Sequence, residues 1–145
     1  MRIALTGLFL GLVLSGCNIL PKPKPTPTPF PGIKVTFPEG FTIEKMAARL
    51  VDKKVIPDDR AFLKLAKTQG KSFKASFPLP ANLEGYLFPD TYSFAPDTDE
   101  KKIIQLLLNT FDKKVASKIT ESGKPVKETM IKASLVEREA EVEED

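Results

Sequence analysis

The sequence predicts an α+β protein in which a small strand–helix–helix unit is followed by a mainly helical region. Residues 33–37 alternate between apolar and polar side chains, as a half-buried strand does. Three later stretches, near residues 43–53, 98–115 and 127–140, repeat apolar residues at the spacing of an amphipathic helix. Glycines and prolines stand between these stretches rather than within them, which is typical of element boundaries.

Composition narrows the chemistry that this chain can perform. Its 145 residues carry a net charge of +3, no histidine and a single cysteine, Cys17. Metal sites built on histidine or cysteine are therefore not expected, and triads that need histidine are excluded for the chain acting alone. No cluster of lysines and arginines interleaves with aromatic residues, and the excess of basic residues is small, so nucleic acid is not an expected partner. Acid–base chemistry must come from carboxylates, lysine or tyrosine, and no cofactor is expected.

The first 16 residues have the pattern of a secretory signal peptide. Arg2 precedes an apolar run, Ile3–Leu14, whose length of about 12 residues is short for a bilayer span of about 20. The run leads into Leu14-Ser15-Gly16-Cys17, which resembles the bacterial lipobox. That resemblance implies that Cys17 is lipidated and holds an extracytoplasmic protein on the bacterial membrane. The alternative is a short uncleaved anchor with an incidental thiol.

The stretch from 17 to 32 is expected to be a linker after the lipidated cysteine. Proline occupies every odd position from Pro21 to Pro31. Such a stretch favours an extended polyproline helix of about 3.1 Å per residue, or roughly 34 Å in all. We expect a spacer that holds the folded part away from the lipid surface; a proline-rich recognition motif is the alternative.

Residues 33–80 are expected to form the first folded unit. After the strand, Thr42 is placed to cap a helix that runs to about Lys53. Pro57-Asp58-Asp59 interrupts the chain and begins a second helix, which Gly70 closes. The stretch VTFPEGFTIEKMAARLVDKKVI and the following Asp59–Phe62 resemble the LysM-like module of endolytic murein transglycosylases. The resemblance implies glycan binding; the alternative is a βαα unit that only packs against its neighbour.

Residues 81–145 are expected to form a second, mainly helical unit. It opens with LEGYLFPDTYSF, in which Pro89-Asp90 turns the chain between two strand-like pieces, Tyr86–Phe88 and Thr91–Phe94. Thr98 is then placed to cap a helix. The apolar stripe of that helix comprises Ile104, Leu107, Leu108, Phe111 and Val115.

The last helix carries the strongest catalytic candidate, Glu137. Met130, Ala133 and Glu137 fall on one helical face, which places an acid at the end of a small and apolar stripe. Apolar surroundings raise the pKa of a carboxylate, which suits a general acid. Glu139 lies about 200° round the helix and faces elsewhere. The alternative is that Glu137 is only the solvated edge of the stripe.

Two separated motifs, LEGYLFPDTYSF and ASLVERE at Ala133–Glu139, resemble those of the MltG (YceG-like) endolytic murein transglycosylase family. The resemblance implies cleavage of peptidoglycan glycan strands to 1,6-anhydromuramoyl ends, with Glu137 as the acid/base. The resemblance also suggests Glu84, as a weaker candidate than Glu137, for orienting the sugar or supporting Glu137. Tyr86 and Tyr92 are candidates for stacking on sugar, with a core role as the alternative. Cell-wall synthesis machinery is a further expected partner.

The chain departs from the family at its C-terminal end. Family catalytic domains continue past the glutamate motif with an Asn-Arg-Leu segment and further groove residues, whereas this sequence ends at Asp145. We therefore expect residues 81–145 to be the N-terminal part of a catalytic domain, with weak or no activity alone. The main alternative function is a non-catalytic peptidoglycan-binding lipoprotein, and a solute-binding lipoprotein fits less well.

Overall fold

The computed structural model describes residues 32–142 of the chain. The signal peptide expected at 1–16, Cys17 and the stretch Pro21–Pro31 lie outside the described residues. In chain order the elements are β1 (Ile33–Thr36), α1 (Ile43–Asp52), α2 (Arg60–Thr68), a 3-10 turn (Gly70–Ser72), β2 (Thr91–Phe94), α3 (Glu100–Phe111), a π-helical turn (Asp112–Ala116), α4 (Ser117–Glu121) and α5 (Val126–Val142). The α+β class predicted from the sequence is confirmed.

The two strands form one antiparallel sheet. β1 pairs with β2 in a register that sets Ile33 opposite Phe94 and Thr36 opposite Thr91. The prediction of a strand-like piece at Tyr86–Phe88 is wrong, because the chain makes a turn there instead. The Tyr86 amide donates to the Leu83 carbonyl at 2.9 Å, and Gly85 takes a φ of +80°, which glycine adopts without steric cost.

The observed N-terminal cap matches the predicted one in α1 and differs from it in α3. The Thr42 hydroxyl accepts from the Lys45 amide at 3.3 Å, which confirms the predicted start of α1. The predicted cap of α3 at Thr98 is wrong by one residue. Asp99 is the cap, since its carboxylate accepts from the amides of Lys101 and Lys102, where a negative charge also meets the positive end of the helix.

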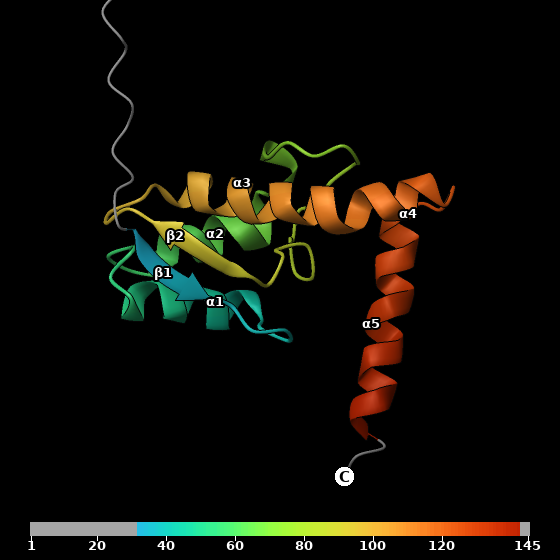
Figure 1. Cartoon of the computed structure of the whole chain (residues 1–145), viewed down its shortest axis with the longest axis horizontal. Helices are drawn as coiled ribbons and strands as arrows, with labels where there is room; N and C mark the ends of the chain where they lie inside the picture. The colour runs from blue at the N-terminus through green and yellow to red at the C-terminus, as the bar shows by residue number, and fades with distance from the viewer. Residues whose placement is uncertain (1–31, 143–145) are drawn as a thin grey trace, which may run out of the picture.

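One hydrophobic core lies between the sheet and helices α1, α2 and α3. α2 packs against both α1 and α3, and the sheet lies alongside them (Figure 1). Buried side chains come from both sides of the boundary expected between residues 80 and 81. Among them are Val35, Leu50, Phe62, Leu83, Tyr92 and Ile104. The predicted stripe of α3 is buried from Ile104 to Phe111, Ile103 joins it, and Val115 is partly buried.

α5 stands apart from this body. The helical stretch from α3 through α4 runs along one edge of the molecule, and α5 leaves its far end crosswise (Figure 1). Val126 is buried with 6% of its surface exposed, and Met130 is partly buried against the core. Every residue from Ile131 to Val136 is exposed. None of the helices within residues 32–142 has the length and apolarity that crossing a bilayer requires.

Candidate functional site

The LEGYLFPDTYSF segment, Leu83–Phe94, lies where several elements meet, and we call it the signature segment. Its side chains Leu83 and Leu87 are buried in the core. Its turn faces the last helix, because a Cβ built on Gly85 would lie 3.9 Å from Cε of Met130 in α5. The segment therefore touches the first turns of the helix that carries Glu137.

Glu84 joins the signature segment to the N-terminal end of α1. Both of its carboxylate oxygens accept from the Ile43 amide at 3.3 Å. Partial burial raises the pKa of Glu84, and the hydrogen bond from Ile43 opposes that rise. A carboxylate at this position satisfies one of the free amides at the start of α1 and meets the positive end of the helix. The contact that the structure gives Glu84 is thus with α1.

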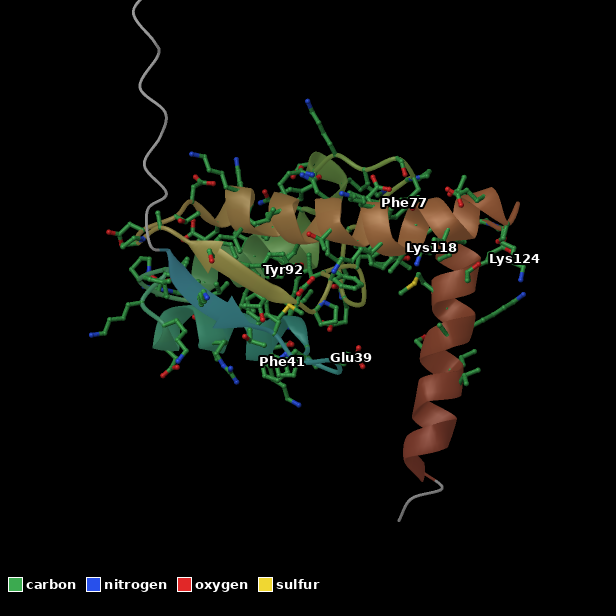
Figure 2. The ribbon with its side chains drawn as sticks, in the orientation of Figure 1. Glu39, Phe41, Phe77, Tyr92, Lys118 and Lys124 are labelled. Atoms are coloured by element: carbon green, nitrogen blue, oxygen red, sulfur yellow. The ribbon has the colours of Figure 1, made fainter. Side chains whose placement is uncertain are left out.

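Tyr86 and Tyr92 lie in the core, each with 7% of its surface exposed. The Tyr86 ring stacks on Phe77 at 5.9 Å between centroids and meets Phe111 edge-on at 5.4 Å. The Tyr92 ring lies 6.0 Å from Phe37. Figure 2 shows Phe77 beside α3 and Tyr92 within the body of the molecule. Burial raises the pKa of both tyrosines and supports the core role over stacking on sugar.

The π-helical turn is held by contacts that no sequence pattern indicated, one with the signature segment and one with Ser76. Asp90 accepts from Nζ of Lys114 at 2.5 Å, and this pairing lowers the pKa of Asp90. The same ammonium lies 4.9 Å from the centroid of the Phe88 ring. Asp112, at the start of the π-helical turn, accepts from the Ser76 amide at 2.7 Å and from its hydroxyl. Pro89-Asp90 signalled a turn, but nothing local paired it with residue 114.

Glu137 lies on α5, seven residues after Met130 and therefore about 10 Å further along the helix axis. Its side chain is outside the described residues, so its catalytic role stays a prediction. Its neighbours Leu135 and Val136 are 56% and 69% exposed, and Ala133 is exposed too. These exposed side chains do not form the covered apolar niche that the sequence predicted around Glu137.

Two hollows lie elsewhere on the described part of the chain. A hollow of about 490 Å³ is lined by the end of α1 and by Pro57–Asp59, just before α2, and no residue of either motif lines it. A smaller one of about 210 Å³ lies at the start of α5, beside Lys124, Thr129 and Lys132. Within the described residues no group of three or more histidine, cysteine, aspartate or glutamate residues could hold a metal ion.

Comparisons with known proteins point to one family. The profile of the YceG-like family matches residues 19–145. An endolytic murein transglycosylase of Streptococcus pneumoniae serotype 2 (strain D39) is 34% identical over 134 residues, which cover 77% of this chain and 24% of that protein. An endolytic murein transglycosylase of Bacillus subtilis (strain 168) is 31% identical over 125 residues, covering 74% of this chain and 34% of that one.

A solved YceG-like protein from Listeria monocytogenes is 25% identical, with a TM-score of 0.49 and coverage of 66% of this chain and 37% of that one. The chain thus spans about a quarter to a third of the length of the two transglycosylases that it matches. Because the family profile covers far more than half of its residues, the chain belongs to the YceG-like family.

Proposed function

We propose that this chain works on peptidoglycan as the glutamate-bearing part of an endolytic lytic transglycosylase. Its relatives in Streptococcus pneumoniae and Bacillus subtilis are named endolytic murein transglycosylases, which supports the proposal. Since the chain spans at most 34% of those relatives, we expect weak activity from it alone. A groove that positions substrate contributes much of the rate of such a reaction.

In the proposed reaction Glu137 protonates the glycosidic oxygen as its bond to the muramoyl carbon breaks. The sugar's own 6-hydroxyl forms the new bond to that carbon and gives its proton to the same carboxylate. The product is a 1,6-anhydromuramoyl end, and no water is consumed. One carboxylate suffices because the substrate supplies the nucleophile, whereas most glycosidases need two.

The observation that carries the proposal is the contact between the signature segment and the first turns of α5, the helix that bears the glutamate motif. The signature segment and the glutamate motif are some fifty residues apart in the sequence, and Gly85 faces Met130 at the base of the Glu137 helix. The backbone of residue 137 then lies about 10 Å beyond this contact. Sugar held beside the signature segment would lie within a few sugar units of Glu137.

The proposal extends to the remaining parts of the chain. We propose that the LysM-like part holds glycan strands and that Glu84, as a weaker candidate, supports sugar binding or Glu137. We also propose that Cys17 carries a lipid anchor that keeps the protein outside the cytoplasm, near the machinery that builds the wall.

Purified sacculi test the proposal directly. We expect wild-type protein to sediment with sacculi and to release small amounts of anhydro-ended muropeptides, measured by mass spectrometry. Glu137→Gln should abolish release and leave sedimentation unchanged. Glu139→Gln, a change of the same kind on another face of the helix, should retain release. Release that survives Glu137→Gln would contradict the assignment of the acid.

The second candidate, a peptidoglycan-binding lipoprotein without catalysis, is favoured by one observation. The described residues around position 137, Leu135 and Val136 among them, are exposed rather than enclosed. The same experiment separates the two functions: sedimentation of wild-type protein without any anhydro product supports the binding protein.

A further inference from the structure

We propose that Asp90 and Lys114 are positioning residues whose ion pair sets the direction in which α5 carries Glu137. The pair fixes the π-helical turn, Asp112–Ala116, and the path of the chain into α4 and α5 follows from that turn. The proposal rests on the proposed function for the importance of Glu137, whereas the geometry that it concerns is independent of activity.

Asp90 joins three parts of the molecule. Its carbonyl accepts from the Phe37 amide at 2.9 Å, directly after β1. One carboxylate oxygen accepts from the Thr91 amide at 2.7 Å, at the start of β2. The other accepts from Lys114 at 2.5 Å. Because the first two contacts hold Asp90 to the sheet, the third ties the π-helical turn to the sheet as well.

Two polar contacts hold the π-helical turn to the body, in addition to the buried side chain of Ala116. Lys114, in its middle, contacts Asp90 and lies over the Phe88 ring. Asp112, at its start, accepts two hydrogen bonds from Ser76. A π-helical turn departs from α-helical spacing and is frequent at functional sites. These contacts stabilise that departure and so determine how the following helix is rotated.

Little else separates this turn from the base of α5. α4 has only five residues, and the chain then turns at Gly123, whose φ is +73°. α5 carries residue 137 about 16 Å beyond its buried anchor Val126. A tilt of about 10° at the base would therefore move the backbone of residue 137 by about 3 Å. A displacement of that size matters, since about 1 Å of misplacement can cost a hundredfold in rate.

The pair is exposed enough that its main effect is geometric. The Lys114 and Asp90 side chains are 50% and 39% exposed. Ion pairs at such exposure contribute little to overall stability, because water and salt screen them. Removing the pair should therefore change the direction of α5 far more than the melting temperature.

Distance measurements between spin labels test the proposal. Labels at exposed positions 45 on α1 and 136 on α5 report the direction of α5, in the full chain with Cys17→Ser. We expect one narrow distance distribution for the parent protein. Asp90→Asn and Lys114→Met should each shift it or at least double its width, with the melting temperature within about 5 °C of the parent. Lys114→Arg keeps the charge and should keep the parent distribution.

The matched control is Arg60→Met, which breaks another exposed ion pair, Asp58–Arg60, that touches neither motif. It should leave the distribution unchanged. An unchanged distribution in Asp90→Asn and Lys114→Met would overturn the proposal, and so would a broad distribution in the parent or in Arg60→Met.

Activity is measured separately on the same variants. If the parent protein releases no anhydro-ended muropeptides while the distances behave as expected, the proposed function is wrong and the positioning role stands. If release is present and Asp90→Asn leaves both release and distances unchanged, the positioning role is wrong. We expect release to fall at least tenfold in Asp90→Asn through the displaced acid.

Discussion

Glu84 lies where the signature segment meets the N-terminal end of α1, and opposing effects act on its pKa. Partial burial disfavours its charged form, and the hydrogen bond from the Ile43 amide favours it. Burial is the larger effect, so the pKa of Glu84 is raised. The folded state therefore holds a proton on Glu84 more tightly than the unfolded chain does. Its stabilising contribution is present below pH 4.5 and is lost as the pH rises through the raised pKa.

Glu84→Gln should remove this pH dependence, because an amide keeps an acceptor for Ile43 and carries no charge to bury. We expect the free energy of unfolding of the variant, relative to wild type, to rise between about pH 4 and pH 7. Urea unfolding at a series of pH values measures the difference. Glu84→Ala, which removes the acceptor, should cost about 1 kcal/mol at neutral pH. If the difference in the free energy of unfolding between Glu84→Gln and wild type stays constant across this pH range, the pKa of Glu84 is not raised by folding.

Among the glycines within residues 32–142, Gly70 is the one whose replacement should cost the most stability. A Cβ there would lie 2.2 Å from the Pro80 carbonyl oxygen and 2.8 Å from that of Ala81, both backbone atoms that cannot move aside cheaply. We expect Gly70→Ala to lower the free energy of unfolding by about 3 kcal/mol. Gly40→Ala is the control, because Gly40 has a positive φ of +73° with nothing within 4 Å of the added carbon. It should cost only about 1 kcal/mol in the same denaturant titration.

α5 depends on its first turns for its attachment to the body. Val126→Asp would place a charge in the buried anchor, and burying an unpaired charge is costly. We expect amide hydrogen exchange along α5 to become much faster while α1, α2 and α3 stay protected. Val136→Asp makes the same change on the same helix at a position that is 69% exposed, and exchange should stay as in wild type. Equal exchange in the two variants would mean that Val126 is not the anchor.

The whole molecule depends on a pairing between distant segments. β2 is the partner of β1 within the described residues, and Leu83 and Tyr92 fill the core beside Val35 and Phe62. A fragment 33–80 lacks that strand and about half of the core. A domain of that size is only marginally stable even when its core is complete. We expect it to be unfolded in proton–nitrogen correlation spectra and a fragment 33–124 to be folded. Dispersed spectra from 33–80 would show instead that the first unit folds alone.

Features that depend on neighbouring residues could be predicted from the sequence. The capping of α1 by Thr42 and the buried stripe from Ile104 to Phe111 are confirmed, because caps and helical faces are set within a few residues. Family membership also followed from the two motifs. The cap of α3 was misplaced by one residue, since Thr98 and Asp99 are both good caps and local pattern does not choose between them.

By itself, then, the sequence determined the α+β class, the main helices and the family, through periodicity, caps and motifs that act over short stretches. Only the tertiary structure decided that β1 pairs with β2, that Tyr86 and Tyr92 turn into the core, and that Asp90 meets Lys114. Those contacts join residues far apart in the chain. They form because a shared core must be buried and its polar edges paired, a requirement that no short stretch of sequence expresses.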